Sequence, residues 1–487
     1  MTLQELLNGA TGVQPIYAIT DLKNHRYIPQ PDVEKAKKAL NPELHDIMNP
    51  ILRPDKHIKI DAADNGGDSA QKVIDTNGEA VTTKTEKVAR IAVALQKLII
   101  KRAVSFLFGN PPKYNDSPNN DQEIAVDKAL KRILYDVKSN SLNRIIASSM
   151  FGFKESAEYW YTVDADNNRY GFPAKQKVRC AIFSPAFGDT LYPYFDQTGD
   201  MVAFSRAYSR KETGDVATDY FETWTDTEHW LWVNGSDGWK VVDGYPKPVA
   251  IGKIPVVYGH QRHFETEDVD KLIDRLEKLL SNFADTNDYH AAPKIFVTGQ
   301  INGWAKKGES GAVIEGDEGA TMNYVSWQSA PESVKLEIET LLKLIYTITQ
   351  TPDISFDAVK GLNVSGIALK LLFMDAHLKV QDKRIVFDEF LQRRVNILLA
   401  YIAQMNTSLA TACESIEIEP EIIPYIITSD QDELNYWMTA NGNQPVISQE
   451  ESIALAGVSM NPAHTMEKIK NEQTAANSFT IDEPVDA

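Results

Sequence analysis

One glycine-containing segment has the outline of a phosphate-binding loop. Residues 361–368 read Gly-Leu-Asn-Val-Ser-Gly-Ile-Ala, so two glycines stand at the spacing that such a loop requires. Ile367 and Ala368, however, occupy the positions where a Lys and a Ser or Thr would hold the phosphates and magnesium. A second glycine-rich stretch, Gly308 to Gly319, lacks the strand-to-helix context of a dinucleotide site. The sequence therefore predicts no nucleotide site in either segment.

The titratable residues form no recognisable metal-binding pattern. His260 and His263 are close in sequence, but no Cys or helical Glu-x-x-His partner accompanies them. Asp268, Asp270 and Asp274 lack the loop glycine and the distal Glu of a calcium-binding loop. We interpret these three as solvated acids in the first turns of a helix, where the helix dipole favours negative charge. We expect no metal and no cofactor.

Candidate nucleophiles are equally isolated. Ser184 and Ser365 have no flanking pattern of a nucleophile elbow. Cys180 and Cys413 are the only two cysteines, too few for a disulfide framework or a metal cluster, and we expect both to be reduced and inert. The sequence predicts that the protein is not an enzyme.

An unusual order of predicted elements begins at Glu265. Apolar residues recur at helical spacing from Glu265 to Tyr289 and again from Glu332 to Gln350. Between these helices, Ala291 to Ala330 is rich in glycine and carries β-type runs at Lys294 to Val297 and Asn323 to Trp327. We predict a small, largely antiparallel β element inserted between two helices.

A loop and a very long helix come next. Thr351 to Gly366 is punctuated by Pro, Asp, Asn and Gly and is predicted to be a loop. From Ile367 to Gln404 no Pro or Gly occurs, which allows a helix of about 38 residues, or about 57 Å. Such lengths are typical of a coiled coil, a membrane span or a structural spine. Ten charged residues in this segment exclude the membrane span.

The first 150 residues are predicted to be largely helical after a polar start. Thr83 and Glu86 have the spacing of a capping box and predict a helix that starts at Thr83 and ends before Gly109. Further helices are predicted at about Gln122 to Val137 and Leu142 to Met150. The polar, glycine-rich segment Ala62 to Ala80 is predicted to be a flexible loop.

Residues Phe153 to His260 have a β-type pattern. Turn signals separate short apolar runs and predict an antiparallel sheet with a meander order. Five of the eight tryptophans fall here: Trp160, Trp224, Trp230, Trp232 and Trp239. We interpret them as sheet core, while a platform for stacking sugars or bases is the alternative.

Charge is distributed unevenly along the chain. The formal net charge is −18, which argues against a simple nucleic-acid clamp. From Met405 to Ala487, 14 acidic residues face only two lysines, a net charge of −12, so the first 404 residues carry −6. We predict an acidic C-terminal domain, with a disordered tail from Asn471 to Ala487.

Three segments carry a resemblance to a known family. Arg102 to Pro112 (RAVSFLFGNPP) resembles the "fLfG-x-P-P" signature of tailed-phage portal proteins. Gly252 to Tyr258, followed by the acid-x-x-Asp-x-Leu-Ile-Asp pattern at Glu267 to Asp274, is similar to the same family. So is Asn363-x-Ser-Gly-x-Ala-Leu369 at the start of the long helix. The order and spacing of these motifs, over roughly Asp32 to Gln404, are closest to the siphophage-type portal family.

The resemblance implies an α+β, ring-forming portal-type subunit with the following parts. They are an N-terminal arm and flexible loop (1–82), a wing (83–263, with helices at 83–150 and an antiparallel sheet at 153–260), stem helix 1 (264–290), a β-containing clip (291–330), stem helix 2 (331–350), a tunnel loop (351–366), a long spine helix (367–404), and an α-helical acidic crown with a disordered tail (405–487).

The function that the resemblance implies is that of a conduit. Twelve subunits would form a ring at one capsid vertex, through which double-stranded DNA is packaged and ejected without sequence-specific contacts. Expected partners are further copies of the chain, the terminase large subunit, a head-tail adaptor, the major capsid protein and scaffold. The expected location is the virion, and the host cytoplasm during assembly. The alternative is a nucleic-acid packaging enzyme or its accessory subunit, a nuclease or an ATPase.

Particular residues follow from this assignment, each with an ordinary structural alternative. Asp353, Asp357, Lys360 and Asn363 would line the DNA channel, or are plain surface polar residues of a loop. Lys306, Lys307 and Glu309 would dock partners at the clip, or form a solvated turn. The apolar positions Leu272, Leu276, Leu280, Leu341 and Ile345 would pack between subunits in the ring, or within one subunit.

Overall fold

The computed structural model describes residues 7, 15–59, 70–74, 80–211, 217–291, 294–299, 319, 321–325, 331–353, 373–425, 439, 448–456 and 462–478. The chain divides into two compact units, one of residues 1–358 and 374–425 and the other of residues 359–373 and 426–487. Within the described residues, both α-helices and antiparallel sheets are present, so the predicted α+β class is confirmed.

The helices of the first unit are α2 (Pro15–Asn24), α3 (Val33–Leu40), η1 (Pro42–Leu44), η2 (Asp46–Met48), α4 (Leu95–Phe108), α5 (Asp121–Asp136), α6 (Ser139–Phe153), η4 (Pro185–Phe187), α7 (Asp270–Ala291), α8 (Pro331–Ile348), α11 (Met374–Met405), η5 (Thr407–Leu409) and α12 (Ala410–Ser415). The second unit contains α14 (Gln449–Ala456) and α15 (Pro462–Ser478). The helices predicted at 122–137, 142–150, 265–289 and 332–350 are therefore confirmed, with ends that differ by a few residues.

The largest sheet is an antiparallel meander. Its strands β7 (Thr190–Phe195), β8 (Met201–Lys211), β9 (Ala217–Trp224), β10 (Glu228–Gly235) and β11 (Gly238–Val241) lie in sequence order, and β12 (Lys247–Pro248) pairs with β10. Helix α2 covers one face, where Ile19 and Leu22 pack against Phe221 and Trp232. The predicted meander is confirmed for these strands.

A second, three-stranded sheet packs against the meander. It has the order β13 (Val256–His260), β5 (Glu155–Asn167), β6 (Ala174–Phe183). Phe183 and Val256 from this sheet meet Phe204 and Trp224 from the meander in one buried cluster. The single sheet predicted for 153–260 is therefore wrong in this respect, because the apolar faces of two sheets bury each other.

Helix α11 packs on the second sheet and on the N-terminal helices. It contacts β13, β6, α4 and α5. Gly259 of β13 permits the close approach, since a Cβ there would stand 2.5 Å from Met150 Cε and 2.9 Å from Phe390 Cδ2. The described helix of 32 residues agrees with the predicted long helix, and residues 367–372 of that prediction lie outside the described residues.

A fully buried ion pair fastens α11 to the sheet. Arg394 is 0% exposed and binds the carboxylate of Glu158 on β5 with two nitrogens, Nη2 to Oε2 at 2.7 Å and Nε to Oε1 at 2.9 Å. Its Nη1 donates to Asn143 Oδ1 of α6 at 2.6 Å, and Trp160 Nε1 donates to Glu158. Burial opposes the charge on Arg394, but the charge of Glu158 and the hydrogen bonds to it outweigh burial and raise the pKa of Arg394, so the guanidinium stays charged.

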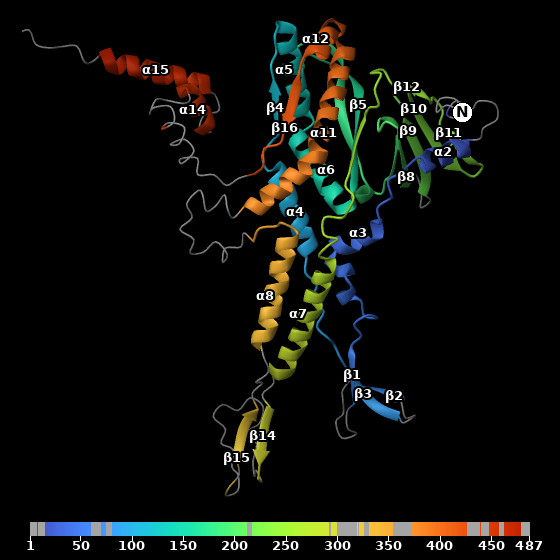
Figure 1. Ribbon diagram of the computed structural model, residues 1–487, viewed down its shortest axis with the longest axis vertical. Helices are drawn as coiled ribbons and strands as arrows, with labels where there is room; N and C mark the ends of the chain where they lie inside the picture. The colour runs from blue at the N-terminus through green and yellow to red at the C-terminus, as the bar shows by residue number, and fades with distance from the viewer. Residues whose placement is uncertain are drawn as a thin grey trace, which may run out of the picture. The chain divides into compact units, whose positions relative to one another are not determined.

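Helices α7 and α8 form a hairpin with a β pair at its far end (Figure 1). Strands β14 (Lys294–Thr298) and β15 (Thr321–Val325) pair antiparallel with Lys294 opposite Val325. The prediction of an antiparallel β element between two helices is confirmed for this pair.

The N-terminal helix prediction was wrong at its start. Thr83 and Glu86 lie in β3 (Ala80–Glu86), the central strand of a sheet ordered β1 (Lys56–Lys59), β3, β2 (Ala70–Ile74). Residues 80–86 form a strand rather than a capped helix start because backbone pairing on both sides stabilises the strand more than a capping box stabilises a helix end. Helix α4 begins only at Leu95. Strand β2 also lies inside the segment that was predicted to be a flexible loop.

The C-terminal boundary also differs from the prediction at 405. The first unit continues to Tyr425, because α12 packs on α11 and α5 and because β16 (Ile418–Glu421) pairs with β4 (Lys113–Asp116). Strand β16 lies within residues 405–487, the region for which an α-helical crown was predicted. The tail predicted to be disordered from Asn471 is helical as far as Ser478 in α15. Among the described residues no helix is long and apolar enough to cross a membrane.

Removing the buried guanidinium should be costly. We expect Arg394→Met to lower the free energy of unfolding of the first unit by about 3–5 kcal/mol, because Glu158 is left buried and unpaired. The neighbouring variant Arg393→Met removes an exposed pair with Glu389 and should cost less than about 1 kcal/mol. Urea unfolding followed by tryptophan fluorescence measures both, and equal losses in the two variants would contradict the role of Arg394.

Candidate functional site

The α7–α8 hairpin has its own apolar core. Ile273 and Leu276 of α7 pack against Leu341 and Ile345 of α8, and Ile99 of α4 closes one end of the cluster. The residues predicted to pack between subunits belong to this core: Leu276, Leu341 and Ile345 are buried, and Leu272 and Leu280 pack against them half-buried. Packing within one chain therefore accounts for their apolar character.

Other apolar side chains of α8 are exposed. Leu336, Leu344 and Ile348 are 65%, 43% and 48% exposed. At 3.6 residues per turn, Leu336 lies on the side of α8 opposite the buried positions Leu341 and Ile345, whereas Leu344 and Ile348 lie at the edge of the buried side. Exposed apolar side chains that lie near one another on a helix indicate a surface that another molecule covers.

An extended segment lies along the other helix of the hairpin. Residues 87–94, here called the strap, connect β3 to α4 without regular secondary structure. Three backbone N–H groups of the strap donate to three side chains of α7: Ala89 to Asp285 Oδ1 at 2.6 Å, Ile91 to Ser281 Oγ at 2.9 Å, and Val93 to Glu277 Oε1 at 2.8 Å. The strap is thus held by a ladder of side-chain to backbone hydrogen bonds.

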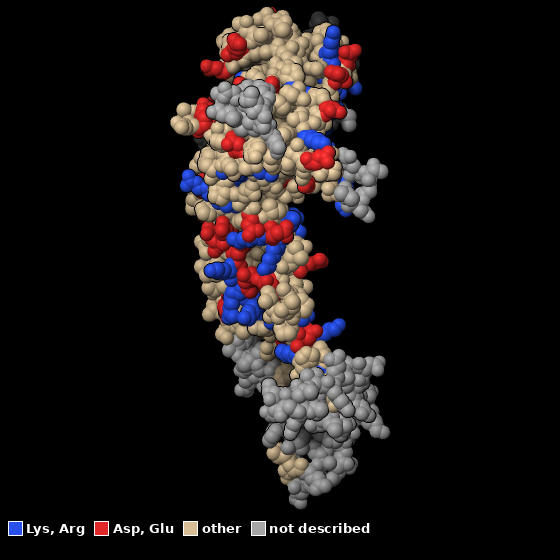
Figure 2. All heavy atoms as spheres, turned by 90° about the vertical axis from the view of Figure 1, so that its right-hand side faces the viewer, with Lys and Arg blue, Asp and Glu red and all other residues tan. Residues whose placement is uncertain are grey.

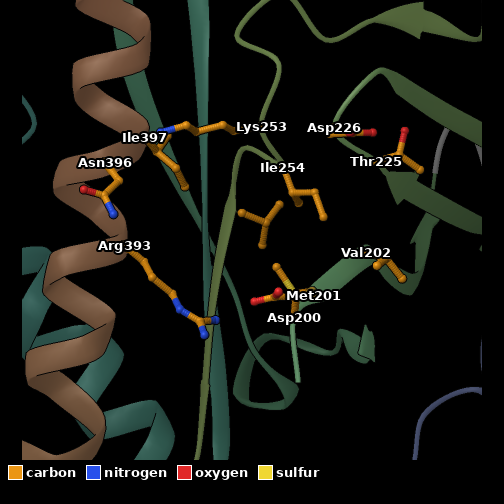
Figure 3. Close-up of a pocket in the computed structure, with 11 residues that line it drawn as sticks. Asp200, Met201, Val202, Thr225, Asp226, Lys253, Ile254, Arg393, Asn396 and Ile397 are labelled. Atoms are coloured by element: carbon orange, nitrogen blue, oxygen red, sulfur yellow. The ribbon is translucent and has the colours of Figure 1, made fainter. Parts of the chain in front are cut away.

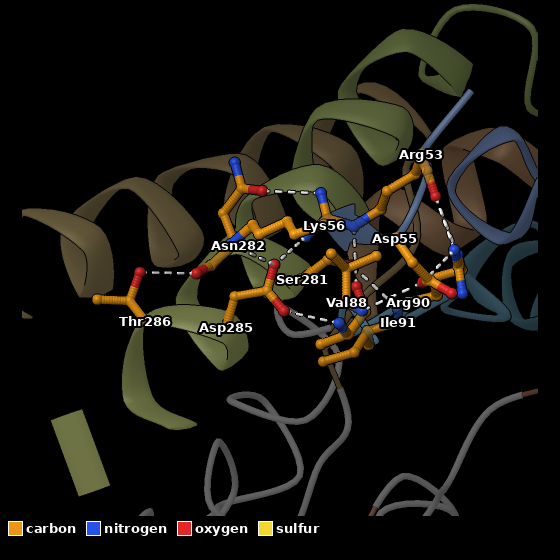
Figure 4. Close-up of polar contacts among 11 residues, drawn as sticks. Arg53, Asp55, Lys56, Val88, Arg90, Ile91, Ser281, Asn282, Asp285 and Thr286 are labelled. Atoms are coloured by element: carbon orange, nitrogen blue, oxygen red, sulfur yellow. Dashed lines mark hydrogen bonds and ion pairs between the residues drawn. The ribbon is translucent and has the colours of Figure 1, made fainter. Parts of the chain in front are cut away.

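The ladder works because two repeats have nearly the same length. Four residues of an α-helix rise about 6 Å, and two residues of extended chain span about 6.6 Å. Glu277, Ser281 and Asp285 are four apart, while their donors in the strap are two apart, so the strap runs antiparallel to α7. Figure 4 shows part of this arrangement, with Ile91 of the strap beside Ser281 of α7 and with Val88 beside Asp55.

Hydrogen bonds and ion pairs of charged side chains stabilise both ends of the ladder. At one end, Arg53 binds Asp285 at 2.7 Å and Asn282 at 2.8 Å, and Arg90 binds Asp55 (Figure 4). At the other end, His45 Nδ1 lies 2.6 Å from Glu277 Oε1, with both side chains buried.

The His45 end of the ladder carries a shifted titration. Burial opposes a charge on His45, but the hydrogen bond to Glu277 and the negative charge of Glu277 outweigh it and raise the pKa of the imidazole. The imidazole of His45 and the Val93 N–H therefore both contact Oε1 of Glu277.

The end of α8 is anchored where the predicted loop begins. Lys379 of α11 donates to the Thr349 carbonyl at 2.8 Å, and Arg102 of α4 donates to the Pro352 carbonyl at 2.8 Å. Lys379 also pairs with Glu265 at 2.6 Å. Burial works against the charge on Glu265, yet Lys379 and Lys383 outweigh it and lower the pKa of that carboxyl. The carboxylate therefore stays ionised and fixes the α8 terminus against α11.

Of the predicted loop and clip residues, the structure describes one. Asp353 follows the anchored Pro352 and is exposed. Asp357, Lys360 and Asn363 lie outside the described residues, as do the clip positions Lys306, Lys307 and Glu309. So does the glycine-containing segment 361–368.

The residues of the RAVSFLFGNPP motif hold two distant parts of the chain together. Gly109 ends α4, and a Cβ on it would stand 2.7 Å from the Cβ of Tyr425. Tyr425 donates its N–H to the Phe106 carbonyl at 2.9 Å, and Asn110 Nδ2 donates to the Pro424 carbonyl at 3.2 Å. The motif therefore serves packing, with glycine required by the close approach of Tyr425.

The remaining candidates for chemistry are separated in the structure. His260 is half-buried with a pKa lowered by burial and by nearby Arg26, whereas His263 is exposed beside Glu267. Among the described residues no three His, Cys, Asp or Glu side chains are grouped to hold a metal ion. The predicted solvation of Asp270 was wrong, since it is half-buried and burial raises its pKa; Asp268 and Asp274 are exposed.

Both cysteines are free thiols with suppressed ionisation. Burial raises the pKa of Cys413 to about 11, and burial together with the charge of Glu158 raises that of Cys180 further.

The tryptophans are core residues. Trp160, Trp224, Trp230 and Trp232 are buried and Trp239 is half-buried, which supports the interpretation as sheet core over a stacking platform.

A surface groove lies between the meander and α11. Its volume is about 700 Å³, and Ile254, Val256 and Ile397 line its floor. Figure 3 shows Arg393 of α11 on one side of the groove and Asp200, which directly precedes β8, on the other. Its wall combines single apolar side chains with dispersed charges of both signs.

Acidic and basic side chains are also interspersed over the face that carries α3 and α7 (Figure 2). Pairs such as Lys35 with Glu267 and Lys38 with Asp46 account for this mixture. Such mixed surfaces give no extended field of one sign.

Sequence reasoning missed the ladder. The only signal was the spacing of Glu277, Ser281 and Asp285 on one side of an amphipathic helix, which is also the spacing of ordinary solvated residues. Nothing in the strap sequence marks its N–H groups as donors to side chains.

Breaking the middle rung should loosen the strap. Ser281 is fully buried, so Ser281→Ala leaves the Ile91 N–H without its acceptor and should cost about 1–3 kcal/mol in unfolding free energy. Hydrogen exchange of the Ile91 amide should also become faster. Thr286→Ala, which removes an exposed hydroxyl of the same helix, is the control and should change stability by less than about 0.5 kcal/mol. Unchanged exchange at Ile91 in Ser281→Ala would rule the ladder out.

Comparison with known proteins gives one family and several solved structures. A family described as phage portal protein, SPP1 Gp6-like, matches residues 30–478. A chain from the neck of an empty gene transfer agent particle matches with 10% identity and a TM-score of 0.39, over 74% of this chain and 90% of that one. A chain from the neck of the native particle matches with 11% identity and a TM-score of 0.35, over 75% of this chain and 88% of that one.

A chain from the virion of the native gene transfer agent particle gives 10% identity, a TM-score of 0.34, and coverage of 75% and 88%. No curated protein matches the sequence. The family match covers far more than half of the chain and includes the α7–β–α8 hairpin, the strap and α11. The chain therefore belongs to the phage portal protein family, SPP1 Gp6-like.

Proposed function

We propose that the chain is the repeating subunit of a ring, expected to contain twelve copies, at one vertex of a phage head. Double-stranded DNA would enter and leave the head through the hole between the copies. The observation that carries this proposal is the family match over residues 30–478, joined to a helix hairpin that exposes apolar side chains on α8. The role is non-enzymatic, because a conduit needs geometry and weak contacts rather than a catalytic group.

The parts of the chain would then have distinct tasks. Helices α7 and α8 would form the stem, β14 and β15 the clip that docks the terminase large subunit and later the head-tail adaptor, and α11 the spine. Residues 83–263 would form the wing, and the acidic region after α11 the crown facing the capsid interior. The major capsid protein and scaffold would bind during assembly in the host cytoplasm, before the ring becomes part of the virion.

We place the ring contact on the exposed apolar side chains of α8. Leu276, Leu341 and Ile345 are buried within the chain, so they offer little further surface to a neighbour. Leu336, Leu344 and Ile348 are exposed on α8, and burying them against the next copy would remove apolar surface from water. Leu272 and Leu280, which are half-buried, remain candidates for the edge of that contact.

The channel lining is proposed to include Asp353, Asp357, Lys360 and Asn363. Asp353 is exposed directly after the anchored end of α8, so the anchor fixes where the loop starts. Two acids and one lysine give a weakly acidic lining, which repels phosphate and lets DNA slide. Partner docking through Lys306, Lys307 and Glu309 of the clip is part of the same proposal.

The ring itself is the first test. Native mass measurement of the purified chain should give a species near twelve times 54.5 kDa, and Leu336→Gln with Leu344→Gln should shift it to monomer while the circular dichroism spectrum is kept. Lys335→Gln, an exposed change on another side of α8, should leave the ring intact. A wild-type monomer at micromolar concentration, or DNA or ATP hydrolysis by the purified protein, would count against the proposal.

The loop is tested separately from the ring. Replacing residues 353–363 with a Gly/Ser segment of equal length should leave the native mass unchanged, because the stem, strap and α11 are untouched. DNA packaging into heads should fall, since the loop no longer positions charged side chains against the passing duplex. Packaging at the wild-type level with this variant would remove the loop from the mechanism.

A further inference from the structure

A cluster of cations surrounds one sheet edge in this acidic chain. The edge strand β6, the loop before it, helix α5 and the turn after α5 bring together six basic residues, here called the basic stripe: Arg132, Lys138, Arg169, Lys175, Lys177 and Arg179. Asp136 is the one carboxylate that pairs with any of them among the described residues, at 3.3 Å from Arg132 and 3.1 Å from Arg169. The local charge is thus strongly positive, against −18 for the chain.

Strand geometry arranges three of these cations in a row. Lys175, Lys177 and Arg179 alternate along β6, so they share one face of the sheet at steps of about 6.6 Å. The residues of β5 opposite Lys177 and Arg179 are Val163 and Tyr161, which carry no charge. In the described part of the chain, none of the three has an ion-pair partner, so their charge is available to a ligand.

The row continues into a small surface pocket. Lys138, Arg169, Lys177 and Arg179 line a pocket of about 200 Å³ together with Tyr135. Lys138 has a left-handed backbone, with φ of 58°, in the short turn between α5 and α6, and its ammonium lies 5.3 Å from the centre of the Tyr135 ring. The turn therefore adds a cation beside the strand.

One polar atom in the pocket wall also lacks a partner. Asp136 Oδ1 receives both arginines, while its Oδ2 is buried without a hydrogen bond in the described structure. Asp136 orients Arg132 and Arg169 without cancelling the other four charges.

We propose that the basic stripe binds the phosphate backbone of double-stranded DNA, separately from the residues proposed to line the channel. A linear row of lysines and arginines suits a linear polyanion. Protein–protein interfaces are depleted in lysine, whereas protein–DNA interfaces are strongly positive. The contact is independent of base sequence, because flexible cations on a flat strand reach only phosphates. The inference rests on the proposed function in one respect, namely that double-stranded DNA is the polyanion that the chain encounters.

The salt dependence of binding tests the stripe. Fluorescence anisotropy of a labelled duplex of mixed sequence measures affinity for the purified full-length protein between 50 and 200 mM salt. The variant Lys175→Gln, Lys177→Gln, Arg179→Gln should weaken binding by at least about tenfold at 100 mM salt. It should also reduce the slope of log affinity against log salt by about 2.7, since each lost phosphate contact removes about 0.9.

A matched variant removes the same charge elsewhere. Lys37→Gln, Lys211→Gln, Lys240→Gln replaces three exposed lysines outside the stripe and should keep the wild-type slope. Equal slopes for wild type and stripe variant, equal losses in the two variants, or no binding by wild type would overturn the inference. Tighter stripe-dependent binding of polyglutamate than of DNA would overturn it too, in favour of an acidic protein partner.

Native mass of both variants separates this inference from the proposed ring. Rings with unchanged DNA binding in the stripe variant overturn the stripe alone. A chain that stays monomeric while the stripe variant loses DNA binding overturns the ring and still supports the stripe.

Discussion

The buried pair of Arg394 with Glu158 is the interaction on which the arrangement of the first unit depends. Burying two charges costs several kcal/mol per ion unless geometry and further hydrogen bonds compensate. Here the guanidinium is bidentate and also binds Asn143, while Trp160 donates to the same carboxylate. The pair joins segments 236 residues apart. Because it tolerates almost no displacement, it fixes α11 against the sheet and against α6.

From that fixed helix, polar contacts reach the hairpin. Lys379, four turns before Arg394 on α11, holds both the end of α8 and Glu265 just before α7. The ladder on α7 then holds the strap by a match of helical and extended pitch, and so holds the sheet β1–β3–β2. Because the hairpin is fixed at one end in this way, its exposed side chains are held in a defined orientation for the contact with a neighbouring copy that is proposed above.

The sequence predicted best where one periodicity had no competitor. Helices α7 and α8 and the β pair between them were predicted because glycines separate two clear amphipathic patterns. The helix start predicted at Thr83 was wrong because a capping box is a local signal. The pairing of Thr83 with Lys59 and Gln71, 24 and 12 residues before it, outweighs the two hydrogen bonds of such a box. The ladder and the Arg394 pair could not be predicted, since each depends on contacts between distant segments that leave no local pattern.

The structure changes which side chains of α8 are proposed to contact a neighbouring copy. Apolar periodicity indicates that one side of a helix is buried, but it does not indicate whether the same chain or another copy buries it. Leu341 and Leu336 therefore look alike in the sequence. The structure separates them: Leu341 faces α7 within the chain, and Leu336 faces away from that core. A side chain that is satisfied inside the subunit contributes little further free energy to assembly. The exposed side of α8 is therefore where assembly can gain the most apolar burial, provided that the anchors on α11 and the strap keep α8 in place.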